Sequence, residues 1–316
     1  MRLGLTVTPF QSGRVRPRME VLVYGAGALG SLVGGLLARE HDVTLVGRDP
    51  HMRTVREDGL RIDGEVDVRV APRALTDGTH RAADLALVTT KAYDTDAAAR
   101  ALATGEYDAV CSLQNGLTEE RLVAALDATV LAGTASYGAR FAEPGRVTCT
   151  GVGEVVVGAL SGGTSPAAAR VGAAFEAAGI EAVVAEDMPA RRFEKLAVNA
   201  GINGPSALAR TENGPTLDGP AGDVAREAAR ETARVARAVG VDLADDRAVD
   251  AVERVAADTA ANRSSMYEDV ANGRRTEVDA IYGAVVDRAD RHGVAVPTCR
   301  TVGSLIRGWE AARGLR

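Results

Sequence analysis

Residues 21–38, VLVYGAGALGSLVGGLLA, have the pattern of a short apolar strand, a glycine-rich turn and the beginning of a helix. Gly25, Gly27 and Gly30 follow the spacing G-x-G-x-x-G, directly after the strand and directly before the helix. In this setting the first glycine permits a tight turn, the second lets the backbone approach a phosphate, and the third packs the helix on the strand. The helix N-terminus adds free N–H groups and the positive end of its dipole. The pattern predicts a dinucleotide-binding loop; the alternative is a tight turn without a ligand.

The same run is uncharged and follows Arg14, Arg16 and Arg18, which resembles a signal peptide or a short membrane span. A membrane helix needs about 20 apolar residues, whereas this run has 18 residues and contains five glycines. The glycine loop accounts for the same residues, so we expect no membrane segment here. Residues 1–18 lack periodicity, and an apolar strand begins directly after Met19. We therefore expect residues 1–18 to be a disordered extension or a mis-called start.

Composition narrows the class of protein further. A chain of 316 residues is long enough for two domains, and its net charge of -6 argues against a nucleic-acid partner. The three cysteines show no CxxC spacing, which indicates reduced thiols in a cytoplasmic protein. The four histidines lack ligand-like spacing, so we assign no metal.

Between residues 19 and 187, short apolar strands alternate with helical stretches near 28–39, 95–103 and 118–126. This alternation is typical of a parallel, doubly wound sheet, so we expect an α/β fold with a Rossmann-type N-terminal domain. RIDGEVDVRV (61–70) and GRVTCTGVGEVVVG (145–158) alternate and turn at glycine, which predicts antiparallel additions. The predicted buried strands are EVLVYG (20–25), DVTLVG (42–47), DLALVTTK (84–91), AVCSLQNG (109–116) and TVLAG (129–133).

After Pro189 the strand patterns stop and helical patterns take over, which predicts an all-helical C-terminal domain over residues 188–316. Gly240 and Gly293 follow two of these helices as C-terminal caps. Since an open α/β sheet binds ligands beyond the carboxyl ends of its strands, we expect the site between the two domains. The predicted helices span residues 190–203, 218–239, 246–260, 277–292 and 297–312.

Three strand ends carry candidate ligand-binding side chains. Arg48 follows the second strand, where an NAD enzyme would carry an acidic residue, and arginine suits a 2′-phosphate. NADPH is therefore favoured over NADH; the alternative is a solvated loop arginine. Lys91 and Asn115 close two further strands at the edge where ligands bind, although Asn115 precedes Gly116 and an Asn-Gly turn is its alternative.

The chain contains only two lysines, Lys91 and Lys195, and every other basic side chain apart from histidine is arginine. An ammonium can give up a proton when its surroundings tune it, whereas a guanidinium stays charged. Lys195, Asn199 and Asn203 are spaced by four, so they share one helix face. Their neighbours are apolar, which favours binding or catalysis over a solvated stripe. Further on, Asn213, Asn262, Ser265 and Glu277 are individually compatible with turns, caps and a first-turn acid.

Taken together, these motifs resemble the ketopantoate reductase (2-dehydropantoate 2-reductase) family of the 6-phosphogluconate dehydrogenase-like superfamily. The resemblance runs from about Met19 to the C-terminus, and the combination is more specific than any single motif. The chain departs mildly from the family pattern in the glutamine of LQNG and in the extension before Met19. The motifs are, in order, GAGALG, Arg48, TTKAYDT, LQNG, GTASYGAR, KLAVNAGIN, ENG, NRSSM and RTEVDAIYG.

Carried over residue by residue, the resemblance implies that Lys195 is the general acid and that Glu277 helps to place the lysine and the cofactor. Asn115 would touch both the nicotinamide side and the substrate. The implied substrate ligands are Asn115, Lys195, Asn199, Asn203, Asn213, Asn262 and Ser265. The implied cofactor contacts are Gly25, Ala26, Gly27, Ala28, Leu29, Gly30, Arg48, Lys91, Asn115, Ala139 and Glu277.

The resemblance implies NADPH-dependent reduction of 2-dehydropantoate to (R)-pantoate in pantothenate and coenzyme A biosynthesis, by a monomer or homodimer. Reduction leaves negative charge on the ketone oxygen, which a cation must stabilise and then protonate, and lysine can do both. Two alternatives stay open: a reductase of another branched 2-keto acid, and a non-catalytic NADPH-sensing module. The sensor would need the glycine loop without the polar helix face.

Overall fold

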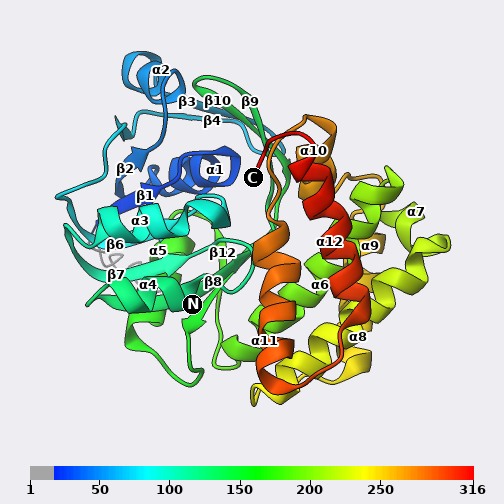
Figure 1. The fold of residues 1–316 in the computed structure, drawn as a ribbon. Coiled ribbons are helices and arrows are strands. Elements are labelled where there is room, and N and C mark those ends of the chain that lie inside the picture. Colours follow the sequence, from blue (N-terminus) through cyan, green and yellow to red (C-terminus); the bar gives the residue numbers. More distant parts are fainter. Residues whose placement is uncertain (1–17) are drawn as a thin grey trace, which may run out of the picture.

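The computed structural model describes residues 18–316, so nearly all of the predicted extension lies outside the described residues. Figure 1 shows two units side by side: an α/β unit that ends with β12 (Glu181–Val184), and a helical unit that begins with α6 (Met188–Ala209). The predicted fold class, a Rossmann-type sheet followed by an all-helical unit, is confirmed.

The main sheet has eight strands in the order β12-β11-β8-β7-β6-β1-β2-β5. All its pairings are parallel except that between β8 and β11. The strands that end at the site, β1, β6 and β7, are neighbours and run in the same direction, so their carboxyl ends meet at one edge. The strands other than β12 are β1 (Glu20–Tyr24), β2 (Asp42–Val46), β5 (Arg73–Leu75), β6 (Ala82–Val88), β7 (Glu106–Ser112), β8 (Thr129–Ala135) and β11 (Glu154–Ala159).

Side chains that alternate along the strands build a core on each face of this sheet. Val21 and Val23 pack with α1 (Ala28–Leu37) and α5 (Pro166–Ala177), whereas Leu22 packs with α3 (Thr95–Leu102) and α4 (Glu119–Ala125). Both faces are buried, which explains why the central strands are apolar runs in the sequence.

A second, four-stranded sheet lies over α1, in the order β4-β3-β10-β9 (Figure 1). The predicted antiparallel hairpin in residues 61–70 is confirmed as β3 and β4. The run 145–158 is not one addition, because its two strands separate: β10 joins this sheet, and β11 joins the main one. The strands of this second sheet are β3 (Leu60–Gly64), β4 (Val68–Val70), β9 (Gly138–Glu143) and β10 (Arg146–Gly151). The remaining helical elements of the α/β unit are α2 (His51–Asp58) and η1 (Ala92–Asp94).

The helical unit packs around α6, and the buried Tyr282, which lies in η2 (Asp279–Gly283), hydrogen-bonds to the backbone of α6. The Tyr282 hydroxyl accepts from the Gly204 N–H at 3.0 Å and donates to the Ala200 carbonyl at 2.5 Å. Gly204 has no space for a side chain here, because a Cβ would lie 2.2 Å from that hydroxyl. Gly240 and Gly293 have φ of 86° and 67°, as predicted for C-terminal caps. The other helices are α7 (Asn213–Asp218), α8 (Ala221–Ala238), α9 (Asp245–Asp258), α10 (Ser265–Ala271), η2 (Asp279–Gly283), α11 (Ala284–His292) and α12 (Pro297–Ala311).

Candidate active site

The glycine loop has the geometry that each of its glycines predicts. Gly25 has φ of 112°, and a Cβ there would lie 2.4 Å from the Thr90 nitrogen. A Cβ on Gly30 would lie 2.3 Å from the Gly25 carbonyl and 2.4 Å from the Thr89 hydroxyl. Gly27 differs, because its nearest heavy atom would be 4.0 Å away, so the backbone is open on that side. The loop therefore fits a pyrophosphate that approaches Gly27 at the start of α1.

Arg48 lies just after β2 with its side chain 89% exposed. Among the described residues its guanidinium pairs with Asp94, whose carboxylate lies 3.2 Å away in η1. That exposed ion pair is weakly held, so the guanidinium is available for an anionic group at the end of β2. The contact of Arg48 with a 2′-phosphate stays a prediction.

Glu277 connects the strand ends to the helical unit. Its Oε1 accepts from the Ala92 N–H at 2.9 Å, and its Oε2 accepts from Asn115 Nδ2 at 2.9 Å. Lys91 Nζ lies 3.5 Å from the same Oε2 and 2.7 Å from Asp269 Oδ2. A single carboxylate from the helical unit thus joins groups that follow β6 and β7.

Lys91 is held as a cation by these neighbours. Burial by itself lowers the pKa of Lys91, but the Glu277 and Asp269 carboxylates outweigh burial and raise the pKa above the ordinary value of lysine. Lys91 is therefore a fixed positive charge at the junction between the two units.

Lys195 differs from Lys91, although both lie near Glu277. Burial lowers the pKa of Lys195, and the charges of Glu277 and Glu119 only partly oppose this effect. The expectation that Glu277 holds the Lys195 ammonium differs from the structure, in which the Glu277 hydrogen bonds go to Ala92, Asn115 and Lys91. A lysine with a lowered pKa and no ion pair among residues 18–316 is suited to proton donation.

The asparagines that share the helix face of Lys195 reach different neighbours. Asn199 Nδ2 donates to Asn115 Oδ1 at 3.4 Å, so this face meets the end of β7. Asn203 is only 6% exposed, and its Nδ2 is buried without a partner in the described part of the chain. An unpaired buried donor costs about 1–3 kcal/mol. Asn203 thus has a hydrogen bond to offer a ligand.

Asn213 has a similar unpaired atom. Its Nδ2 donates to Thr259 Oγ1 at 2.9 Å, while its Oδ1 is buried without a partner within residues 18–316. The Asn213 N–H donates to the Asn262 carbonyl, which brings these two predicted residues together. The side chains of Asn262 and Ser265 are exposed. The neighbouring Ser264 points inward instead, where it caps α10 and bonds Ser206.

Ala139 is separated from this network. It lies in β9, pairs with Cys149 of β10 and packs on the core around α1. Its contact with a cofactor stays a prediction.

Two contributors were not predicted. Asp269, which is 5% exposed, binds Lys91, and Arg274 Nε donates to its other oxygen at 3.1 Å. Gln114 donates to the Thr90 carbonyl and accepts from Thr118, which ties the ends of β6 and β7 together. The sequence offered two signals, an acid four residues after Ser265 and the glutamine of LQNG. It did not show that they bond to Lys91 and Thr90, which lie 178 and 24 positions away.

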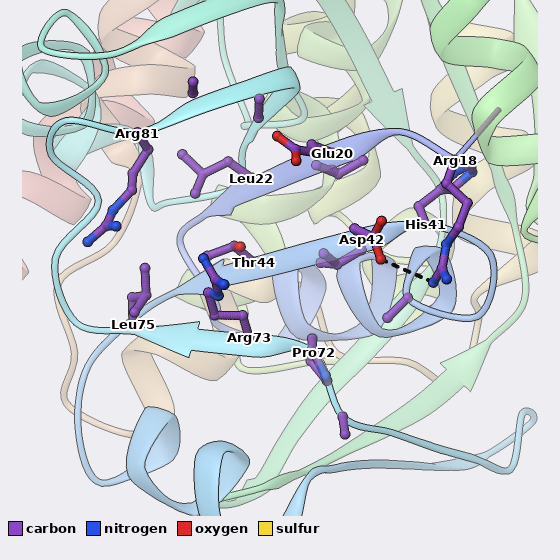
Figure 2. A pocket seen from close by; sticks show the side chains of 16 residues that line it. Arg18, Glu20, Leu22, His41, Asp42, Thr44, Pro72, Arg73, Leu75 and Arg81 are labelled. Carbon is purple, nitrogen blue, oxygen red and sulfur yellow. Dashed lines mark ion pairs between the residues drawn. The ribbon is translucent and has the colours of Figure 1, made fainter.

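A hollow of about 430 Å³ lies elsewhere, at the amino-terminal ends of β1, β2 and β5. Figure 2 shows Arg73 and Arg81 on its walls and the ion pair of Arg18 with Asp42, 3.2 Å, at its rim. None of the predicted site residues lines it. Within residues 18–316, no group of histidine, cysteine and acidic side chains is arranged to hold a metal ion. Among the same residues, every helix is too short or too polar to cross a membrane.

Comparison with known proteins gives consistent matches. Residues 21–162 match the family described as Ketopantoate reductase PanE/ApbA, and residues 187–310 match its C-terminal family. A 2-dehydropantoate 2-reductase of Halobacterium salinarum is 44% identical, over 92% of this chain and 98% of the relative.

Two solved structures have the same fold. A PanE/ApbA family ketopantoate reductase from Ralstonia eutropha JMP134 is 33% identical, with a TM-score of 0.85, over 94% of this chain and 100% of that one. A D-mandelate dehydrogenase with NADH and anilino(oxo)acetate is 23% identical, with a TM-score of 0.87, over the same shares. Because the identity is only 23%, this likeness shows that the two proteins share a fold and says nothing about the substrate.

Proposed function

This chain belongs to the ketopantoate reductase family, and on that premise we propose that it reduces 2-dehydropantoate to (R)-pantoate with NADPH, in pantothenate and coenzyme A biosynthesis. It is an oxidoreductase that acts on a small molecule. The observation that carries the proposal is the junction at Glu277, where the ends of β6 and β7 meet the helix that bears Lys195 and Asn199. A sensor would need the glycine loop but not this polar helix face.

The proton donor in this proposal is Lys195. When bound, reduced nicotinamide supplies the hydride that reaches the ketone carbon, and negative charge develops on the ketone oxygen. The Lys195 ammonium stabilises that charge and then transfers a proton from Nζ to the oxygen. Its lowered pKa favours the transfer, because desolvation disfavours the charged ammonium relative to the neutral amine that remains.

Other polar side chains orient the two ligands. Glu277 fixes the Asn115 amide, which lies between the strand edge and Asn199. The unpaired buried atoms of Asn203 and Asn213 offer one donor and one acceptor to the substrate. We assign Asn262 and Ser265 to the same substrate, with the carry-over from the family as their support.

The cofactor lies along the α/β unit in this proposal. The loop Gly25–Gly30 holds the pyrophosphate, and the exposed guanidinium of Arg48 pairs with the 2′-phosphate of NADPH. Lys91, Ala139 and Glu277 complete the cofactor contacts. We assign cofactor binding to residues 19–187 and substrate binding to residues 188–316.

We also propose a compartment and an oligomeric state for this enzyme. The three cysteines are buried free thiols, which supports a reducing, cytoplasmic compartment. We propose a monomer or a homodimer.

An absorbance assay at 340 nm tests the proposed reaction. Purified protein is mixed with NADPH and 2-dehydropantoate, and then with other branched 2-keto acids at equal concentration. Fast NADPH oxidation with 2-dehydropantoate supports the proposal, and faster oxidation with another keto acid transfers the assignment to that substrate. Binding of NADPH without turnover of any keto acid favours the sensor.

A further inference from the structure

Both lysines of the chain are influenced by one carboxylate, Glu277, although only Lys91 pairs with it. Lys91 Nζ lies 3.5 Å from Glu277 Oε2. The charge of Glu277 also acts on Lys195, where it opposes the lowering of the pKa by burial. Asn115 bridges the two sides, because its amide donates to Glu277 and accepts from Asn199, one helical turn from Lys195. Glu277 therefore pairs directly with the Lys91 ammonium, and its charge also acts on Lys195, with which it forms no ion pair among residues 18–316.

Glu119, the other carboxylate that acts on Lys195, is already paired. Glu119 of α4 forms a buried ion pair with Arg192 of α6 at 2.5 Å, with side chains 3% and 9% exposed. This pairing reduces the attraction of Glu119 for Lys195. Glu277 is then the carboxylate whose charge balance bears most directly on that ammonium.

Around Lys91 the charge balance is also explicit. Asp269 of α10 binds Lys91 with one oxygen and Arg274 with the other, at 2.7 and 3.1 Å. Tyr93 also acts on Lys91, and the Arg275 guanidinium lies 4.6 Å from the centre of the Tyr93 ring. Asp269 therefore competes with Glu277 for the Lys91 charge. Loss of Lys91 leaves more of the negative charge of Glu277 to act on Lys195. Loss of Asp269 leaves less of it, because Lys91 then neutralises Glu277 more fully.

We propose that Lys91 is a positioning residue that controls the protonation of Lys195 through their shared carboxylate, Glu277. With Lys91 in place, part of the Glu277 charge is neutralised, so Lys195 releases its proton more readily. Without Lys91, the whole Glu277 charge holds the proton on Lys195. The coupling is a property of the folded protein; its consequence for turnover rests on the proposed function.

Three variants separate this role from a structural one. Lys91→Met removes the charge, Lys91→Arg keeps it, and Asp269→Asn removes the competing carboxylate at nearly constant volume. We expect the titration midpoint of Lys195 to move to higher pH in Lys91→Met and to lower pH in Asp269→Asn. Lys91→Arg should titrate close to the wild type. In steady-state assays, the high-pH limb of kcat/KM should shift in the same directions.

Because the sequence contains only two lysines, NMR of protein labelled with 13C at lysine Cε measures Lys195 directly. The wild type gives two signals, and each Lys91 variant gives only that of Lys195. Equal midpoints in Lys91→Met and Lys91→Arg would overturn the proposal, as would shifts of the same sign in Lys91→Met and Asp269→Asn. If Lys91→Met does not fold, as judged by circular dichroism, the sign of the Asp269→Asn shift decides. The measurement needs no turnover, so it stands apart from any failure of the proposed reaction.

Discussion

Asn115 Nδ2 donates to Glu277 Oε2 at 2.9 Å, across the boundary between the α/β unit and the helical unit. The two residues are 162 positions apart in the sequence. This bond fixes the amide that follows β7 against the acid that precedes η2. The Asn115 Oδ1 that remains accepts from Asn199, so the orientation of the amide is set from both sides.

Replacing Glu277 with glutamine should therefore uncouple this junction. The variant keeps the shape of the side chain but loses the charge that faces Lys91 and Lys195. We expect kcat to fall by about tenfold or more, since charge-assisted hydrogen bonds are worth roughly 1.5–3 kcal/mol. Steady-state kinetics check this, with Glu40→Gln as an exposed control. Wild-type kcat in Glu277→Gln would remove Glu277 from the mechanism.

Gly27 and Gly30 should respond differently to alanine. In Gly27→Ala the added methyl group enters open space, so the fold should stay intact while the Kd for NADPH rises by about tenfold or more. In Gly30→Ala the methyl group would meet the Gly25 carbonyl, so the free energy of unfolding should fall by about 1–3 kcal/mol. Thermal melting without cofactor and NADPH fluorescence titration separate the two effects. Normal NADPH binding by Gly27→Ala would contradict the pyrophosphate assignment.

Arg48 tests the choice of cofactor. Arg48→Ala should raise the KM for NADPH by about tenfold and leave the KM for NADH nearly unchanged, because only NADPH carries the 2′-phosphate. Asp94→Asn is a matched variant: it frees the guanidinium from its ion pair and should not weaken NADPH binding. An equal rise in KM for both cofactors in Arg48→Ala would mean that this arginine does not read the 2′-phosphate.

Asn203 offers a prediction on stability as well as activity. Because its buried Nδ2 is unpaired, Asn203→Leu should leave the free energy of unfolding unchanged or raise it by about 1 kcal/mol. The KM for 2-dehydropantoate should rise by about tenfold, since one polar contact is lost. Urea unfolding and steady-state kinetics measure the two quantities. A destabilised variant with a normal KM would show that the amide has a structural role instead.

The parts of the fold that the sequence predicts are those with local causes. The glycine loop, the central strands and the shared face of Lys195 and Asn199 follow from spacing over a few residues. The second sheet does not, because β10 and β11 have similar apolar patterns and differ only in their distant partners.

The same limit applies to the candidate site. The pairing of Lys91 with Asp269 spans 178 positions, and no pattern in the chain identifies it. Similarly, NRSSM does not reveal that Ser264 points inward while Ser265 is exposed, because the helix start decides this. The role of Glu277 was expected from family resemblance, but its contact with Lys91 came from the structure.

The role of Lys195 as proton donor is tested most directly by NADPH oxidation at 340 nm with 2-dehydropantoate, measured for the wild type, Lys195→Ala and Lys195→Arg across pH. We expect fast wild-type turnover that declines as pH rises through a Lys195 pKa below the usual value, because the proton donor is then lost. Both variants should lose about 10²–10⁴-fold in kcat while they still bind NADPH. Near-wild-type turnover by Lys195→Arg, whose guanidinium keeps its proton, would contradict the assignment of Lys195 as the proton donor.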